Sequence, residues 1–201
     1  MRYDNIDIAR GLAILVVISW HVLGVHSPWT DGWAMSIFFF IMGIFYKQPE
    51  CFAVMVKKKA LTLLVPWLAY SIPAFISLIM TYSGKEVLMK IVNPYGCIHG
   101  VSWFLICMFW CYVIYYFVHK YFGKNINYVF VVALLISLLG FYSGKVHIMG
   151  HRIVLPMFFS TSMTAVIFVV LGERLKDYFK VMTRPSYKML IFVGILFSGG
   201  E

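Results

Sequence analysis

An arginine and a histidine stand eleven residues apart in an otherwise apolar stretch near the start of the sequence, DIARGLAILVVISWHVLG (residues 7–24). In an α-helix, eleven residues make three turns plus about 20°, so Arg10 and His21 share one face, roughly 16 Å apart along the axis. Asp7 precedes Arg10 by about one turn and lies near the same stripe. An imidazole in this position can accept a proton, and a guanidinium can donate hydrogen bonds to an anion or to the base.

Two interpretations of these residues remain open. If the helix crosses a membrane with Arg10 at the inner boundary, His21 lies near or beyond the middle of a hydrocarbon core about 30 Å thick. An ionisable residue at that depth is costly unless it faces a cavity or a partner, which favours a functional role. The alternative is a histidine that hydrogen-bonds across a helix bundle, with Arg10 as an anchor whose charged head reaches the interface.

The composition places these residues in a membrane protein. Hydrophobic residues make up 62% of the 201 residues and charged residues only 12%, whereas soluble domains are about one-half apolar and one-quarter charged. The apolar residues form blocks, and a spanning helix needs roughly 20 of them. We therefore predict an all-α, polytopic bundle of transmembrane helices. Its seven apolar blocks cover about residues 8–25, 33–46, 60–82, 101–118, 128–142, 155–172 and 189–197.

Three of these blocks have unusual features. The second is short for a perpendicular crossing, so it is either a tilted span or a re-entrant segment shielded by other helices. Pro66 and Pro73 lie inside the third block and predict a kink there. The last block is too short to finish a crossing. We therefore expect the sequence to be the N-terminal part of a larger protein.

The basic residues indicate a membrane topology and not a nucleic-acid site. The formal net charge is +9, and the lysines and arginines cluster between the apolar blocks. If the N-terminus is inside and all seven blocks cross, only Lys85, Lys90, Lys145 and Arg152 of the 17 basic residues lie outside. This asymmetry predicts a cytoplasmic N-terminus. It also supports the second block as a crossing.

No metal site is predicted. His147 and His151 are four residues apart, but no third ligand is evident, and Gly150 lies between them. The sequence also has no nucleophile-elbow, P-loop or dinucleotide-binding motif.

Five segments, taken in order, resemble the membrane acyltransferase-3 family of sugar and polysaccharide O-acetyltransferases, which includes fucose 4-O-acetylase-like proteins. The pair Arg10 and His21 matches its R-x10-H signature, and FFFIMGIFYK (residues 38–47) is similar to its second-span aromatic-Gly-aromatic segment. KKKALTLLVPWL (57–68) resembles its basic loop before a Leu-rich, Pro-aromatic helix start. SWFLICMF (102–109) resembles its Trp-Phe-Leu span, and AVIFVVLGERLK (165–176) its apolar-Gly-x-x-Leu segment.

The resemblance covers the whole chain and implies a single membrane-embedded acyltransferase domain over residues 1–201, with about seven of ten family spans present. It implies transfer of an acyl group, usually acetyl from acetyl-CoA, to a hydroxyl. His21 would then be the catalytic base that accepts the hydroxyl proton, with an acyl-histidine intermediate as a less favoured alternative. Arg10 would position the donor or the base, and Asp7 would pair with Arg10.

The resemblance also suggests roles for a basic and an aromatic segment. Lys57, Lys58 and Lys59 would bind the phosphates of coenzyme A at the inner face. Lysines stand here where the family frequently has arginines, which changes the geometry of any phosphate contact. The alternative for each lysine is a topology-setting contact with anionic lipid headgroups. Trp103 and Phe104 would line the acceptor cavity, although an interfacial aromatic belt also explains Trp103.

The expected protein is therefore an O-acetyltransferase of the bacterial inner membrane. Its partners would be membrane lipid and a carbohydrate or lipid-linked acceptor, and it would bind no nucleic acid. One alternative is a proton-coupled or small-solute transporter in which His21 is a proton relay. Another is a non-catalytic fragment in which these residues only pack.

Overall fold

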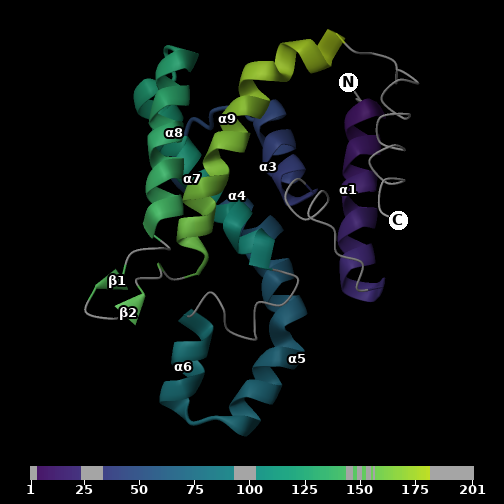
Figure 1. The fold of residues 1–201 in the computed structure, drawn as a ribbon, viewed down its shortest axis with the longest axis vertical. Coiled ribbons are helices and arrows are strands. Elements are labelled where there is room, and N and C mark those ends of the chain that lie inside the picture. Colours follow the sequence, from purple (N-terminus) through teal and green to yellow (C-terminus); the bar gives the residue numbers. More distant parts are fainter. Residues whose placement is uncertain are drawn as a thin grey trace. The chain divides into compact units, whose positions relative to one another are not determined.

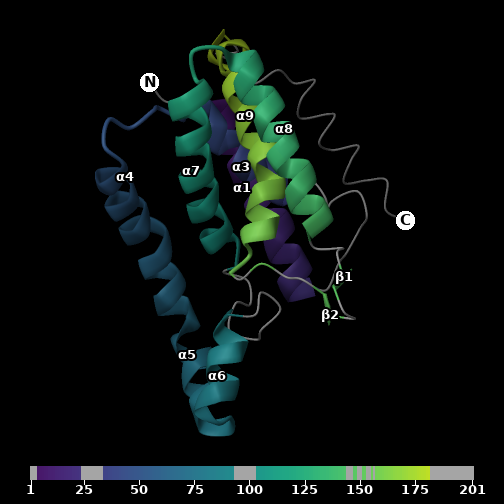
Figure 2. The same cartoon turned by 90° about the vertical axis from the view of Figure 1, so that its left-hand side faces the viewer.

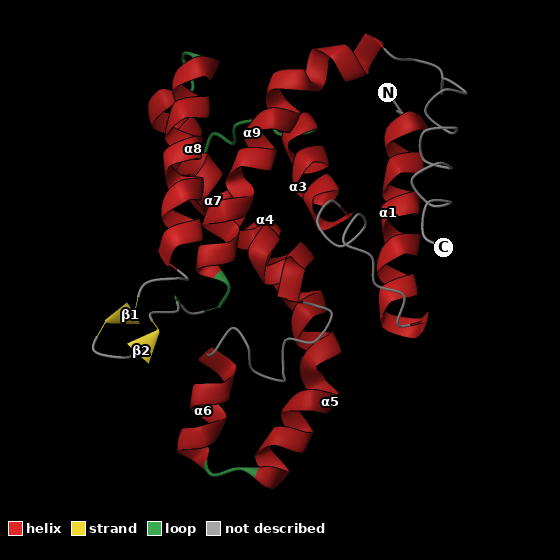
Figure 3. Ribbon diagram, in the orientation of Figure 1, coloured by secondary structure: helices red, strands yellow, loops and turns green. Residues whose placement is uncertain are grey.

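The computed structural model describes residues 4–23, 34–92, 103–143, 147–148, 151–152, 155 and 157–181. Helices dominate these residues, and two short strands form a small hairpin (Figures 1 and 3). The helices are α1 (Asp4–Leu23), α3 (Ala34–Ile44), α4 (Phe52–Lys59), the π-helix η1 (Ala60–Leu64), α5 (Val65–Thr81), α6 (Gly84–Val92), α7 (Trp103–Phe122), α8 (Ile126–Ser143) and α9 (Phe159–Val181). The strands are β1 (His147–Ile148) and β2 (His151–Arg152).

The predicted helical membrane fold is confirmed. Six of the seven apolar blocks coincide with helices, and the seventh (189–197) lies outside the described residues. Three described segments are long and apolar enough to cross a membrane: Phe52–Thr81, Trp103–Phe122 and Ile126–Ser143. Helix α1 has 20 residues, which span about 30 Å, the thickness of a hydrocarbon core. Helix α3 has 11 residues, about half of that thickness.

The chain divides into two compact units, which are described separately. The first contains Met1–Tyr46 and Phe168–Glu201, and the second contains Lys47–Ile167. The boundary falls within α9.

In the first unit, α1 and α3 pack in opposite directions. Ile6 near the start of α1 clusters with Ile41 and Ile44 near the end of α3. Val16, farther along α1, packs against Met35 at the start of α3. The buried apolar residues of α1, Ile6, Ala13 and Val16, lie within about 80° of one another around the helix axis, so one face of α1 is buried.

Helices α3 and α9 cross in this unit at two glycines. A Cβ atom added to Gly43 would overlap the carbonyl oxygen of Val169, and one added to Gly172 would overlap the carbonyl oxygen of Phe40. The two backbones therefore touch directly. Small residues allow such close approach between membrane helices, where dispersion contacts replace the hydrophobic effect.

In the second unit, α4, η1 and α5 form one continuous helical segment of 30 residues. The prediction of a loop at Lys57–Lys59 is therefore wrong, because these lysines form the last turn of α4. Helix α4 begins at Phe52, after Pro49, and contains mostly good helix formers with no Gly or Pro. Met55 is buried on its inner face, so tertiary packing extends the helix beyond the apolar block.

The sequence predicted a kink in this segment, and the structure has the π-helix η1 immediately before Pro66. The amide of Val65 donates to the carbonyl of Ala60, five residues earlier. Pro66 has no N–H to donate, and its ring would crowd the carbonyl four residues before it. Widening the preceding turn relieves that conflict. Pro73, in contrast, lies inside α5, which continues to Thr81.

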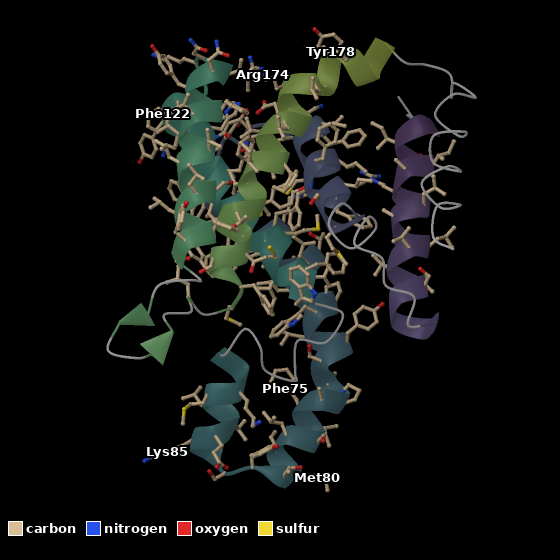
Figure 4. The ribbon with its side chains drawn as sticks, viewed as in Figure 1. Phe75, Met80, Lys85, Phe122, Arg174 and Tyr178 are labelled. Carbon is tan, nitrogen blue, oxygen red and sulfur yellow. The ribbon has the colours of Figure 1, made fainter. Side chains whose placement is uncertain are left out.

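Helix α6 was not predicted, although the sequence contains its start signal. The amide of Ser83 and its hydroxyl both donate to the Glu86 carboxylate, at 3.0 and 3.1 Å. The Ser-x-x-Glu sequence is that of a capping box, which starts helices, and the bond from the Ser83 amide to the Glu86 carboxylate is one of the two bonds of that motif. Helices α5 and α6 form a hairpin, with Met80 and Lys85 at its turn (Figure 4).

Helices α7 and α8 lie side by side in both views (Figures 1 and 2), and the first part of α9 joins them through small polar side chains. The Ser137 hydroxyl on α8 donates to the carbonyls of Met163 and Thr164, at 3.1 and 2.9 Å. The Cys111 thiol on α7 donates to the carbonyl of Ser162 at 3.3 Å. Such hydrogen bonds between helices are typical of membrane bundles.

Strands β1 and β2 pair in antiparallel fashion, with His147 opposite Arg152 and Ile148 opposite His151. The two histidines therefore do not lie on one helical turn. Among the described residues, no group of three His, Cys, Asp or Glu side chains could hold a metal ion.

Candidate functional site

Arg10 is held by an acidic side chain of its own helix. One guanidinium nitrogen lies 3.6 Å from a carboxylate oxygen of Asp7, three residues earlier. The two side chains are each 43% exposed. Asp7 lies in the first two turns of α1, where a negative charge also interacts favourably with the helix dipole. The structure thus places Asp7 beside Arg10, as the sequence led us to expect.

A ring from a second element also contacts Arg10. The guanidinium carbon lies 5.2 Å from the centre of the Phe45 ring, just after α3 ends. This is a cation–π contact, so Arg10 connects α1 to the end of α3. A guanidinium has five N–H donors, and Arg10 is still partly exposed. Arg10 therefore keeps N–H donors for a ligand, while the Asp7 carboxylate and the Phe45 ring restrict the orientation of its guanidinium.

His21 belongs to the same uninterrupted helix as Arg10. Helix α1 runs without a break from Asp4 to Leu23. The helical spacing that relates Arg10 to His21, about 20° around the axis and roughly 16 Å along it, is therefore present in the backbone. The side chain of His21 lies outside the described part of the structure, so its predicted role remains a prediction.

The three lysines differ from one another in their surroundings. Lys57 and Lys58 are exposed, whereas Lys59 is half-buried. The Lys59 ammonium lies 3.7 Å from the centre of the Tyr112 ring on α7. Lys59 is therefore fixed by a residue far away in the sequence, and the other two lysines extend from the surface of α4.

The predicted acceptor residues lie at the first turn of α7. The Trp103 ring contacts Phe158, with ring centres 5.4 Å apart. Phe104, the next residue of α7, is half-buried. Farther along α7, Trp110 packs edge-on against Phe159 at 5.1 Å.

Sequence reasoning missed Phe158 and Phe159. Met157 and Phe158 both have positive φ angles, 51° and 59°, which non-glycine residues rarely adopt. The carbonyl of Phe158 accepts hydrogen bonds from the Ser162 amide and hydroxyl, at 2.9 and 2.8 Å. The turn before α9 thus presents Phe158 to Trp103. The adjacent aromatics of the sequence PMFFS (residues 156–160) are the only local signal.

A buried carboxylate was also missed. Glu173 is 7% exposed on α9 and lies 3.5 Å from the Lys176 ammonium. It follows Gly172, at the close crossing with α3 in the first unit. Charged residues are rarely buried without a partner. The sequence LGERLK (171–176) carries both acidic and basic residues at the end of an apolar block. Nothing in that pattern indicated that Glu173 is buried.

The predicted site residues belong to both units. Asp7, Arg10 and His21 are part of the first unit, and Lys57–Lys59, Trp103 and Phe104 are part of the second. Within each unit the structure brings residues together as described above: Arg10 with Asp7 in the first, and Lys59 with α7 in the second.

The family model acyltransferase 3, described as an acyltransferase domain, matches residues 3–199. No curated protein and no solved structure matches the chain.

Proposed function

The chain belongs to the acyltransferase-3 family, and from this premise we propose that it is an integral-membrane O-acetyltransferase. It moves an acetyl group from acetyl-CoA to a hydroxyl of a sugar, polysaccharide precursor or glycolipid. One observation carries the proposal: unbroken helix α1 sets Arg10 and His21 on one stripe, and Asp7 and Phe45 hold the guanidinium in place.

The proposed chemistry uses His21 as a general base. The neutral imidazole takes the proton of the acceptor hydroxyl as its oxygen attacks the thioester carbonyl carbon. The carbon–sulfur bond then breaks, and the imidazolium returns the proton to the departing thiolate. Arg10 donates hydrogen bonds that position the donor or the base, for which a planar guanidinium is well suited.

The donor phosphates are assigned to the middle of α7 and the acceptor to its first turn. Lys59 contacts Tyr112, and Phe52 at the start of α4 contacts Tyr116 and Phe117, both at 5.1 Å. The start of α4 thus lies against the half of α7 that ends near Lys120, and Lys59 lies against the middle of that helix. Trp103 is at the other end.

This arrangement supports an orientation with the N-terminus in the cytoplasm of a bacterial inner membrane. The Lys120 ammonium lies 5.9 Å from the ring centre of Tyr116, which also contacts Phe52 at the start of α4. Lys120 and the lysines of α4 are among the residues that the positive-inside rule assigns to the cytoplasm. Acetyl-CoA would be bound on that side.

The test measures acetyl transfer from labelled acetyl-CoA in membranes that contain the full natural chain. We expect His21→Ala to lower the rate at least about 100-fold, because general base catalysis contributes that much or more. Arg10→Lys keeps the charge but loses the planar fork, and we expect a loss of about tenfold. Undiminished transfer by the His21 variant would overturn the assignment of the base.

Ser19→Ala is the matched control for both variants. Ser19 lies on α1, and its hydroxyl donates to the Val16 carbonyl of the same helix, at 2.7 Å. It is two residues from His21 and therefore on a different face. We expect its rate to remain within about twofold of wild type, since the change is local. Labelled acetyl that stays on the protein without an acceptor would instead indicate an acyl-histidine intermediate.

A further inference from the structure

The ring of Tyr112 and the ammonium of Lys59 form the closest contact of this kind among the described residues. The ammonium lies 3.7 Å from the ring centre, whereas the other lysine–tyrosine contacts measure 4.2 to 6.0 Å. A cation over an aromatic face is attracted by the negative face of the ring. Both side chains are half-buried, and partial loss of water strengthens the attraction.

The neighbouring packing fixes which lysine meets the ring. Phe52, the first residue of α4, contacts the rings of both Tyr116 and Phe117, and η1 packs directly against α7. Lys59 is the last residue of α4 before the π-helix. Because the register of α4 against α7 is set on both sides of Lys59, Tyr112 meets Lys59 and not Lys57 or Lys58.

Lys57 and Lys58 differ from Lys59 in a way that matters for binding. Both are exposed, and neither makes an ion pair or ring contact within the described part of the chain. An exposed lysine loses side-chain entropy when it binds an anion and interacts through water. Lys59 has already lost much of that freedom, and its ammonium still has N–H donors beyond the face that meets the ring.

We propose that Lys59 is the specific phosphate ligand of the donor site and that Tyr112 is the residue that positions it. Lys57 and Lys58 then contribute mainly long-range charge. The ligand is a phosphate group, either that of coenzyme A or that of an anionic lipid. A preorganised cation binds more tightly than a mobile one because less freedom is lost on binding. The proposal rests on the acetyltransferase function proposed above.

The experiment compares two donors in membranes that contain the full natural chain. Acetyl-CoA carries the phosphates, and S-acetyl-pantetheine carries the same thioester without them. We expect Lys59→Gln to raise the KM for acetyl-CoA about tenfold, the size of one charge-assisted contact. Neither the kcat nor the KM for S-acetyl-pantetheine should change. Lys57→Gln and Lys58→Gln should each raise the KM for acetyl-CoA only about twofold.

Substitutions at Tyr112 test the positioning role. Tyr112→Phe retains the aromatic face and should leave both KM values within about twofold of wild type. Tyr112→Leu removes the face but keeps an apolar side chain, and it should raise the KM for acetyl-CoA about three- to tenfold. Lys59→Arg keeps a cation that stacks on the ring and should restore most of the affinity that Lys59→Gln loses.

Lys90→Gln provides the matched control. Lys90 also lies over a tyrosine ring, Tyr82, at 4.2 Å, but it belongs to α6. It should leave the KM for acetyl-CoA unchanged. The proposal is overturned if Lys57→Gln or Lys58→Gln raises that KM more than Lys59→Gln does. It is also overturned if Tyr112→Leu behaves like Tyr112→Phe.

Two further outcomes separate this proposal from its premise. If Lys59→Gln changes the KM of both donors equally and the change follows the anionic lipid content, the phosphate belongs to a lipid and the donor assignment is wrong. If the wild-type protein transfers no acetyl group from either donor, the proposed function fails. Binding of coenzyme A to the membranes, measured with the same variants, then tests the role of Lys59 independently.

Discussion

The two units hold a cation in different ways. Arg10 in the first unit is paired with an acid three residues away on its own helix and lies over the ring of Phe45. Lys59 in the second unit has no acidic partner among the described residues and lies over the ring of Tyr112, on another helix. A pair within one helix follows from sequence spacing. A pair between helices exists only because the helices pack.

The two units also pack their helices differently. In the first, α3 and α9 touch backbone to backbone at Gly43 and Gly172. In the second, the hydroxyl of Ser137 and the thiol of Cys111 donate to carbonyls of α9. At the glycine crossing, an added side-chain atom would force the two helices apart. Loss of one of the hydrogen bonds in the second unit does not require the helices to move. The first unit should therefore be more sensitive to small substitutions.

The largest expected effect comes from the glycine crossing. Gly43→Ala adds a Cβ atom that would overlap the Val169 carbonyl, so α3 and α9 must separate. We expect a loss of about 1–3 kcal/mol in the free energy of unfolding, as for other overpacked sites. Unfolding of the purified protein in mixed micelles with increasing SDS measures this change.

Gly11→Ala is the control for that substitution. Gly11 lies inside α1 with nothing within 4 Å of an added Cβ atom. Alanine is a better helix former, so the free energy of unfolding should stay the same or rise by up to about 1 kcal/mol. Equal destabilisation by both alanines would mean that the close crossing does not stabilise the first unit.

A smaller effect is expected in the second unit. Ser137→Ala removes the hydrogen bonds to the carbonyls of Met163 and Thr164. Interhelical hydrogen bonds in membranes are worth about 0.6 kcal/mol on average, and the same SDS titration should show a decrease of that size. Ser19→Ala, which removes a bond within α1, should change the value by less than about 0.5 kcal/mol. A decrease for Ser137→Ala as large as that for Gly43→Ala would remove the contrast between the units.

The smallest effect is expected for the ion pair of Arg10. Asp7→Asn removes a carboxylate that is 43% exposed, and ion pairs three or four residues apart on a helix contribute about 0.2–0.5 kcal/mol. Unfolding measured at low and high NaCl should show that the difference from wild type shrinks as salt screens the charges. The effect of Lys59→Gln on stability should depend less on salt, since a half-buried cation over a ring is poorly screened. Equal salt dependence would weaken the distinction between the two cations.

Much of the fold followed from the distribution of apolar residues. The blocks at 8–25, 101–118 and 128–142 are the helices α1, α7 and α8, because long apolar runs must satisfy their backbone hydrogen bonds internally in lipid. Helices α4 and α6 were missed because they are short and carry charged residues. Composition is a poor guide for such segments, and the capping box at Ser83 was the usable signal.

The candidate site was predictable to a similar degree. Spacing alone placed Asp7 beside Arg10, because residues three apart on a helix are neighbours. It did not distinguish Lys59 from Lys57 and Lys58, which have the same side chain. The Trp103–Phe158 contact was also beyond sequence reasoning, since it depends on the positive φ angles before α9.

The sequence by itself determined that this chain is helical, embedded in a membrane and marked by the Arg10–His21 spacing. Hydrophobicity and helical periodicity are properties of consecutive residues, and they act before any helix meets another. Only the tertiary structure decided that Phe45 lies against Arg10 and Tyr112 against Lys59. It also buried Glu173. Those contacts depend on which faces of separate helices meet, and packing of side chains and backbone sets that choice.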